Sequence, residues 1–333
     1  MKTIKWLFCV IVLSILFIFA GYHFRHPPQV SISSINRNSQ HQRRRPRTPN
    51  VEPNNSPENI VIVYNRIPKT GSTSFMNATY KLALVNRFSV ALVKLSTKKY
   101  LWHFNDQYFF AKNITLWQAR KPAVFHGHFP FLGFIPLGFP QPLYINIVRD
   151  PLERFVSHYY FLRFGDTYSP NKIRKRHGDP TTLDECVLQR KYDCNITRMW
   201  LQIPYFCGSD PICWKPGNKF ALHRAKENVL NYYFLVGTTD RIGNFVEILD
   251  KALPRIFKGA GKMFNFGRGI HLRKTKKKIP VKEETITQIK ASSIWKMEQD
   301  FYVFVKERFD AFYANFQVSR RVDYLKLVKS RVG

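Results

Sequence analysis

The sequence has 333 residues, enough for one large hydrophobic core or two smaller ones. It contains 53 Lys and Arg residues against 22 Asp and Glu residues, so the formal net charge is +31. This charge lies far outside the range usual for a soluble enzyme. It favours a polyanionic partner such as nucleic acid, an anionic lipid surface or an acidic polysaccharide.

An uncharged run at residues 6–22 is just long enough to span a thin membrane. A cleaved signal peptide is the alternative, but the run is long for such a signal and no Ala-x-Ala-like site follows it. Because Lys2 and Lys5 precede the run, we expect residues 1–5 in the cytosol and the rest of the chain in the lumen. Residues 23–59 are polar and rich in proline, which predicts a disordered stem before a lumenal domain.

Four of the five cysteines fall in the part of the chain expected in an oxidising lumen, since Cys9 lies within the uncharged run. Four cysteines allow three connectivities. Separations of eight and six residues favour two local disulfides, Cys186 with Cys194 and Cys207 with Cys213. A zinc site is the competing interpretation, although neither separation is the short C-x-x-C pair typical of zinc ligands.

Sequons for N-glycosylation begin at Asn113 and Asn195 and are consistent with a secretory route. Further sequons begin at Asn77 and Asn54. We expect glycans at Asn113 and Asn195. We expect none at Asn77, which falls in the first turns of the helix described next.

From residue 60 the sequence alternates apolar strands with amphipathic helices, which predicts an α/β fold with a central parallel sheet. Residues 60–63 are β-branched and predict a buried strand. Pro68 then ends the strand, Lys69 supplies a positive charge, and Gly71 lets the backbone approach a ligand. Because N–H groups at a helix N-terminus bind anions, the hydroxyl residues before a helix expected from residue 75 predict a phosphate-binding turn.

This turn has two other interpretations. In nucleoside triphosphatases the Lys follows the second Gly of G-x-x-x-x-G-K-[ST], whereas Lys69 precedes Gly71, so such an enzyme is disfavoured. An ordinary strand–turn–helix without a ligand remains the alternative.

A helix is expected over residues 105–112, and residues 122–129 have the composition of a strand. Within that strand His126 and His128 are two positions apart and would point to the same face. Catalytic histidines and satisfied core histidines are both compatible with this pattern.

Residues 143–148 predict the next strand, which delivers Arg149 to its carboxyl end. Asp150 and Pro151 suit the N-cap and first position of a helix, which carries Ser157 two turns later. Open α/β sheets bind ligands at this edge, so Arg149 is a candidate anion ligand. The alternative is an Arg149 that merely pairs with Asp150.

The remaining chain predicts a strand at 233–237, a helix at 245–253 ended by Pro254, and helices at 281–290 and 294–312. Basic loops occur at 172–177 and 271–280 and suit a polyanion, or simply a solvated charged surface. No clustered carboxylates appear that would hold a metal, so no metal is expected.

Six motifs in order resemble the heparan sulfate 2-O-sulfotransferase family, over most of residues 60–312. They are residues 64–74 (YNRIPKTGSTS), 125–128 (FHGH), 147–151 (IVRDP), 159–166 (YYFLRFGD), 200–208 (WLQIPYFCG) and 271–275 (HLRKT). Ser169 and His158 depart from the Arg and Tyr that vertebrate members carry there, which bears on substrate preference.

The resemblance implies a P-loop-like sulfotransferase fold in a type II Golgi membrane protein that works as a homotrimer. It implies a donor, 3′-phosphoadenosine 5′-phosphosulfate, with its 5′-phosphosulfate on Lys69, Thr70, Gly71, Ser72 and Thr73, and its 3′-phosphate on Arg149 and Ser157. Thr275 and Lys278 match positions that close over the nucleotide, and His126 and His128 match the active-site histidines. Positions lining the saccharide groove match Arg66, Asn77, Tyr80, Arg174 and Arg273.

The implied reaction transfers a sulfuryl group to the 2-hydroxyl of iduronate, and less often glucuronate, in heparan sulfate. Such a transfer needs a base for the hydroxyl proton, which an imidazole suits, and a cation on the leaving phosphate, which suits Lys69. The alternatives are a dermatan or chondroitin uronyl 2-O-sulfotransferase and a catalytically inactive heparan-binding membrane protein. The predicted anchor and lumenal cysteines argue against nucleic acid as the partner.

Overall fold

The computed structural model describes residues 56–94, 102–266 and 274–319. Within these ranges no helix is both long and apolar enough to cross a membrane, and the predicted anchor at residues 6–22 lies outside them. Residues expected at the end of the stem form a 3₁₀ helix, η1 (Pro57–Asn59), and Glu58 of this helix pairs with Arg255 at 2.7 Å. The folded domain therefore includes part of the predicted stem.

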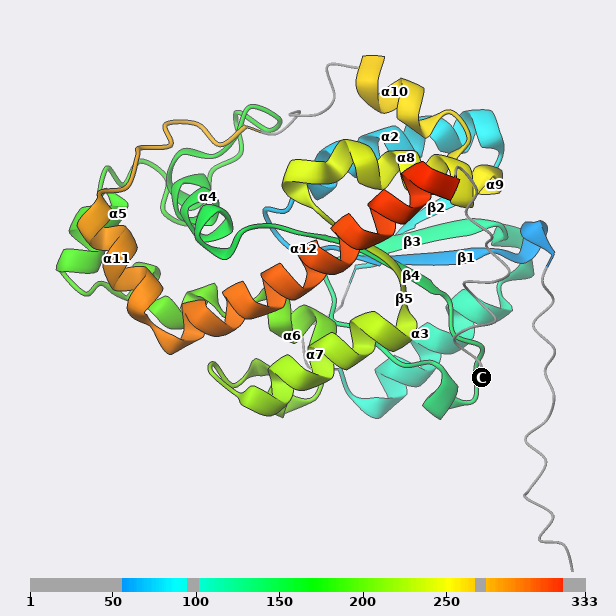
Figure 1. The fold of residues 1–333 in the computed structure, drawn as a ribbon, viewed down its shortest axis with the longest axis horizontal. Coiled ribbons are helices and arrows are strands. Elements are labelled where there is room, and N and C mark those ends of the chain that lie inside the picture. Colours follow the sequence, from blue (N-terminus) through cyan, green and yellow to red (C-terminus); the bar gives the residue numbers. More distant parts are fainter. Residues whose placement is uncertain (1–55, 95–101, 267–273, 320–333) are drawn as a thin grey trace, which may run out of the picture. The chain divides into compact units, whose positions relative to one another are not determined.

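The centre of the described part is a five-stranded sheet in the order β2-β3-β1-β4-β5, with every neighbouring pair parallel (Figure 1). This confirms the predicted α/β class. β2 was not predicted, because its four residues form a partly exposed edge strand without a run of buried positions. The strands are β1 (Val61–Asn65), β2 (Ser89–Leu92), β3 (Ala123–Gly127), β4 (Leu143–Val148) and β5 (Tyr233–Thr238).

Helices cover both faces of the sheet (Figure 1). On one face, Ile62 and Ile145 of the sheet pack with Phe75 and Phe245 of the covering helices. These helices are α2 (Ser72–Asn86), α8 (Ile242–Ala252), α9 (Pro254–Phe257) and α10 (Ala260–Phe266). On the other face the covering helices are α3 (Phe104–Leu116), α6 (Gln202–Cys207) and α7 (Lys219–Tyr232).

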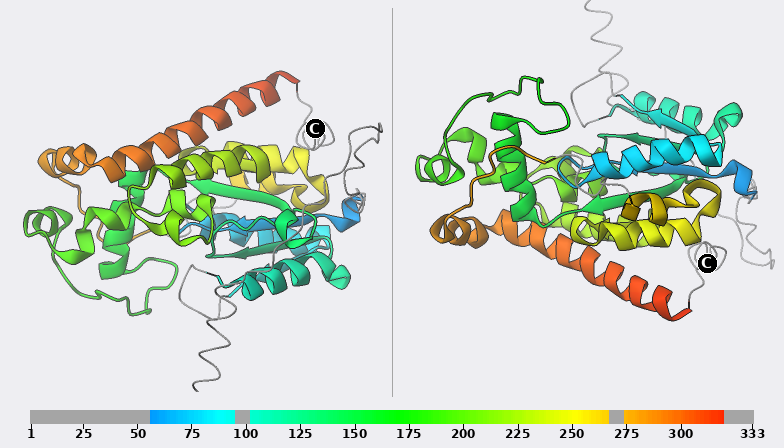
Figure 2. Two further views of the ribbon diagram at one scale, coloured as in Figure 1. Left: turned by 90° about the horizontal axis from the view of Figure 1, so that it is seen from below. Right: turned by 90° about the horizontal axis from the view of Figure 1, so that it is seen from above.

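The last helix, α12 (Ser293–Ser319), lies along β5 and joins the two cores (Figure 2). Phe301 packs into the core on one face of the sheet and Phe309 into the core on the other. β5 is the outer strand of the described sheet, so α12 covers an edge that would otherwise expose backbone groups.

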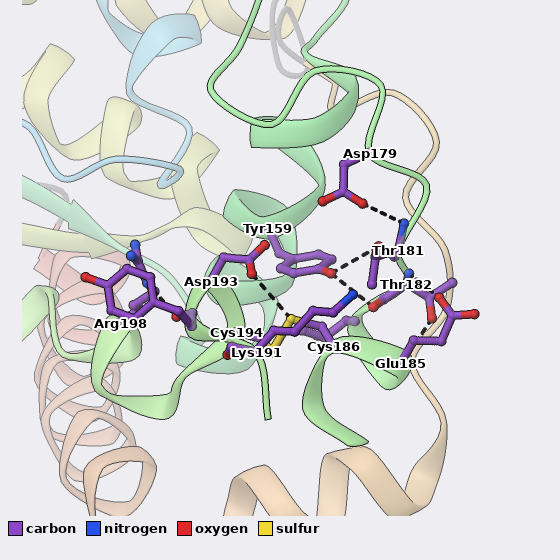
Figure 3. The surroundings of a disulfide bond; sticks show 12 residues. Tyr159, Asp179, Thr181, Thr182, Glu185, Cys186, Lys191, Asp193, Cys194 and Arg198 are labelled. Carbon is purple, nitrogen blue, oxygen red and sulfur yellow. Dashed lines mark hydrogen bonds between the residues drawn. A yellow bond between two sulfur atoms is a disulfide. The ribbon is translucent and has the colours of Figure 1, made fainter. Parts of the chain in front are cut away.

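A third core lies under α4 (Pro151–Phe164), α5 (Leu183–Leu188) and α11 (Glu283–Ala291), and the disulfide between Cys186 and Cys194 belongs to it. The Tyr159 hydroxyl donates to the carbonyl oxygens of Thr181 and Thr182, both at 3.0 Å, and so ties α4 to the start of α5 (Figure 3). The second disulfide joins Cys207 and Cys213. Both disulfides have the predicted pairing.

Several predicted boundaries were wrong by a few residues. α2 begins at Ser72 rather than residue 75, because Gly71 adopts a left-handed conformation (φ 80°) and serves as its N-cap. α8 ends at Ala252, just before Pro254 as predicted, but it begins at Ile242 rather than residue 245. Pro254 also opens the separate helix α9, because the missing N–H of a proline costs no hydrogen bond at the first helical position. The remaining short 3₁₀ helices are η2 (Gln118–Arg120), η3 (Ile135–Leu137), η4 (Tyr192–Cys194), η5 (Ile196–Met199), η6 (Pro211–Trp214) and η7 (Thr239–Arg241).

Candidate active site

The turn between β1 and α2 is built by local backbone constraints. Gly71 has φ 80°, and Lys69 has φ 70°, a conformation uncommon for a residue with a Cβ. Thr70 is fully buried, and its hydroxyl donates to the Ile67 carbonyl at 3.0 Å, which closes the turn from inside. Backbone strain of this kind concentrates at ligand sites. Three hydroxyl residues, Ser72, Thr73 and Ser74, occupy the first turn of α2, which has no acidic residue.

A cavity of about 290 Å³ opens beside this turn, at the carboxyl edge of the sheet. Its walls contain three permanent cations, Arg66, Lys69 and Arg149, and no carboxylate. Among the described residues no group of three or more His, Cys, Asp or Glu could hold a metal ion. The cavity therefore suits an anionic ligand. It is lined by Arg66, Pro68, Lys69, Gly71, Ser72, Thr73, Ser74, His128, Arg149, Ser157, His158, Phe161, Thr239 and Ile242.

Lys69 reaches across this cavity to distant parts of the chain. Its Nζ donates to Thr275 Oγ1 at 2.9 Å and lies 4.3 Å from the centroid of the Phe161 ring. Thr275 Oγ1 is also 3.4 Å from Ser157 Oγ. The structure thus brings together Lys69, Ser157 and Thr275, which the sequence assigned to different parts of one nucleotide site.

Arg149 stands where β4 ends, as predicted, but it does not pair with Asp150. Its guanidinium contacts Glu153 Oε2 at 3.0 Å and the Lys69 carbonyl at 3.4 Å. Asp150 instead caps α4 by accepting the Glu153 amide at 2.9 Å. Arg149 therefore joins the turn between β1 and α2 to the first turn of α4.

His126 lies behind the turn and is 2% exposed. Its Nδ1 is 3.2 Å from Arg66 Nη1 and its Nε2 is 2.7 Å from the Tyr80 hydroxyl. A guanidinium can only donate, so Nδ1 accepts and Nε2 carries the proton that is donated to Tyr80. Burial, together with the charges of Arg66 and His128, lowers the pKa of His126 to about 4, and the ring is neutral near pH 7.

His128 has a different environment, because β3 ends at Gly127 and the predicted strand to residue 129 was too long. Its side chain is exposed and lines the cavity. His128 Nδ1 is 2.7 Å from the Arg66 carbonyl, which can only accept, so Nδ1 carries a proton. In the neutral ring Nε2 is then the basic nitrogen. The sequence predicted that both histidines point to the same face of a strand; the structure gives them different tautomers and exposures.

The sequence pattern that defines the sulfotransferase family matches residues 55–305. The chain belongs to this family. It is 47% identical over 254 residues to heparan sulfate 2-O-sulfotransferase 1 of Homo sapiens and to that of Mus musculus, covering 76% of this chain and 71% of each relative. It is 46% identical to heparin sulfate O-sulfotransferase of Drosophila melanogaster, over 76% of this chain and 73% of the relative.

Three of the residues predicted to line the saccharide groove, Asn77, Tyr80 and Arg174, lie outside the lining of this cavity. Tyr80 is 43% exposed and contacts His126, and Asn77 is partly buried on α2. Arg174 is largely buried, pairs with the buried Asp166 at 3.2 Å, and stacks 4.4 Å from the Phe161 ring centroid. Arg174 therefore supports a wall of the cavity through Phe161. Arg273 lies outside the described residues, and Lys278 is exposed beyond the cavity lining.

The cavity residues that were not predicted as ligands include His158, Phe161 and Thr239. Phe161 follows Ser157 by four positions and His158 by three on α4, so it lies on the same side of the helix as each of them and could have been recognised. Burial and the charges of Arg154, Lys69 and Arg198 lower the pKa of His158 to about 4. No local sequence pattern marks Thr239 as a cavity residue. It is tied to the turn by a tertiary contact, in which its hydroxyl donates to the Thr70 carbonyl at 3.2 Å.

Proposed function

We propose that this sulfotransferase moves a sulfuryl group from 3′-phosphoadenosine 5′-phosphosulfate to the 2-hydroxyl of iduronate, and less often glucuronate, in heparan sulfate. The observation that carries the proposal is the cavity in which Lys69, Arg149 and the N-terminus of α2 meet His128. The names and identity of the relatives support the same substrate.

The cavity fits the donor by charge. Lys69, Thr70, Gly71, Ser72 and Thr73 form the turn proposed for the 5′-phosphosulfate, where backbone N–H groups and a lysine favour an anion. Arg149 and Ser157 on the opposite wall are proposed for the 3′-phosphate. Thr275, held by Lys69 and Ser157, would close this site, with Lys278 at its outer side.

His128 is the proposed base. Since its Nδ1 proton is donated to the Arg66 carbonyl, Nε2 can take the proton of the acceptor hydroxyl as the new S–O bond forms. His126 has no such role in this scheme, because its Nδ1 accepts from Arg66 and its Nε2 proton is directed to Tyr80. We propose that His126 orients Arg66 and Tyr80 beside the acceptor.

Lys69 is the proposed catalytic cation. The bound donor supplies the sulfuryl group, and cleavage of its bridging S–O bond leaves negative charge on the 5′-phosphate. An ammonium group placed where charge develops lowers the barrier to such transfers. Lys69 lines the cavity, with its Nζ over the Phe161 ring and hydrogen-bonded to Thr275.

The acceptor is proposed to lie along Arg66, Asn77, Tyr80, Arg174 and Arg273, with the +31 net charge attracting the polyanion. We also propose a type II Golgi membrane protein, anchored by residues 6–22, with a lumenal domain from residue 60 and a homotrimeric assembly. Asn113 and Asn195 are exposed and are the proposed glycan sites.

One experiment separates this proposal from its alternatives. The full-length protein is incubated with radiolabelled donor and a panel of desulfated glycosaminoglycans, and the products are analysed as disaccharides. Label in 2-O-sulfated iduronate of heparan sulfate is expected. Label confined to dermatan or chondroitin would assign the protein to that uronyl substrate, and absence of label with retained heparin binding would favour an inactive heparan-binding protein.

A further inference from the structure

Gln202 is fully buried outside the cavity, yet it holds the backbone of Arg149. The Arg149 amide donates to Gln202 Oε1 at 2.9 Å, and Gln202 Nε2 donates to the Arg149 carbonyl at 2.9 Å. β4 ends at Val148, so Arg149 lies just past the regular strand. One side-chain amide therefore satisfies both backbone groups of the residue proposed to bind the 3′-phosphate.

Glu298, which comes from α12 and is also fully buried, fixes the orientation of this amide. Its carboxylate accepts from the amides of Leu201 at 2.8 Å and Ile203 at 3.2 Å. It also accepts from the Gln202 amide at 3.3 Å and from Gln202 Nε2 at 3.4 Å. Gln202 Nε2 thus faces two acceptors, Glu298 and the Arg149 carbonyl, and a flipped amide would place its oxygen against both.

The helix that carries Gln202 is itself tied to the core at its other end. Asn65 Nδ2 donates to the Tyr205 carbonyl at 3.1 Å. Asn228 Nδ2 donates to the carbonyls of Phe206 at 2.8 Å and Cys207 at 3.1 Å. The Cys207–Cys213 disulfide joins the end of α6 to η6. α6 therefore presents Gln202 from a fixed position rather than from a mobile loop.

We propose that Gln202, oriented by Glu298, is a positioning residue for Arg149 and thereby sets the preference of the site for a nucleotide with a 3′-phosphate. The inference rests on the proposed function, in which Arg149 binds that phosphate. A guanidinium recognises phosphate only when its donors are directed correctly, so a displaced Arg149 backbone weakens this contact and leaves the 5′ contacts intact.

The test compares two nucleotides on the full-length protein by isothermal titration calorimetry. The probes are 3′-phosphoadenosine 5′-phosphate and adenosine 5′-phosphate, which differ only in the 3′-phosphate. In Gln202→Met the side chain keeps its approximate volume and loses both hydrogen bonds to Arg149. We expect affinity for the first nucleotide to fall about 10-fold, affinity for the second to stay unchanged, and kcat at saturating donor to stay near the wild-type value.

Asn228→Leu is the matched control, because it removes another buried amide that binds α6 but does not contact Arg149. It should lower the melting temperature and leave the nucleotide preference unchanged. If Gln202→Met does not fold, Gln202→Glu provides the same test, since it keeps the acceptor for the Arg149 amide and places an oxygen against the Arg149 carbonyl.

The outcomes separate this inference from the proposed function. If the wild-type protein binds both nucleotides equally, the assignment of Arg149 to a 3′-phosphate fails. If the wild type discriminates and the Gln202 variants discriminate equally well, the positioning role is overturned while the proposed function stands. A Gln202 variant that loses affinity for both nucleotides alike also overturns it, because that pattern reports general destabilisation.

Discussion

The two sides of the cavity are built in different ways. One side is the turn from Arg66 to Ser74, a contiguous stretch whose shape follows from Gly71, Thr70 and the start of α2. The opposite wall takes Arg149 from the position after β4, and Ser157 and Phe161 from α4. Thr275, from a segment far along the chain, contacts Lys69 and Ser157.

The two sides also differ in what keeps them in place. The turn is held by a hydrogen bond between two of its own residues, from the Thr70 hydroxyl to the Ile67 carbonyl. The wall depends on buried side chains from elsewhere, above all Gln202 and Glu298 behind Arg149. Substitutions in the turn should therefore affect the chemistry directly, whereas substitutions around the wall should affect nucleotide affinity.

The largest loss of activity is expected from a substitution in the turn. Lys69→Ala should lower kcat by about 10³-fold, as is typical for the loss of a group that stabilises developing charge. The melting temperature should hardly change, because the Lys69 side chain lies at the cavity surface. The exposed Lys251 on α8 provides a charge-matched control. Near-normal turnover of Lys69→Ala would remove the turn from the mechanism.

His128→Ala should lower kcat by about 10²-fold or more, the usual effect of losing a general base, with heparin affinity unchanged. His223, an exposed histidine on α7, serves as the control. A His128 variant that turns over normally would disprove its assignment as the base.

Arg149→Ala tests whether the opposite wall binds the donor. Removing one charge-assisted contact to a phosphate should raise the KM for the donor by about 10- to 100-fold. The KM for heparan sulfate should change little. Arg224, which pairs with Asp210 at 3.4 Å on the surface, is the control. An equal rise in both KM values would mean that the wall does not separate donor from acceptor.

The smallest effect concerns stability at acidic pH. The pKa values of His126, behind the turn, and His158, on the wall, are both lowered from 6.5 to about 4. Between these values the unfolded chain binds protons that the folded protein does not, so stability present above pH 6.5 is lost as the pH falls toward 4.

Urea unfolding at pH 7.5, 6 and 5 measures this dependence. His158→Gln should flatten the decline by removing one of the two groups, and His126→Gln should do the same if it folds. Bound 3′-phosphoadenosine 5′-phosphate should reduce the contribution of His158 only, because a nearby anion raises the pKa of a histidine. An unchanged slope in both variants would place the acid sensitivity elsewhere.

Local sequence patterns were sufficient to predict many of the structural elements of this protein. The β-branched run of β1, the N-cap at Asp150 and the short disulfide loops each depend on neighbouring residues, and each was predicted within a few positions. α7 was missed although Asn218 and the apolar residues Ala221, Ala225 and Val229 carry a readable helical pattern.

The sequence by itself determined the chemical groups of the site, because Lys69, Gly71 and Ser72 adjoin one another and the strand–turn–helix is a local structure. Only the tertiary structure distinguished the two histidines, since the tautomers of His126 and His128 follow from contacts with Arg66, about 60 residues away. It also decided that Gln202 and Glu298 support Arg149. Those contacts join residues separated by 53 and 96 positions, and such separations are bridged by packing of the sheet and helices rather than by any sequence periodicity.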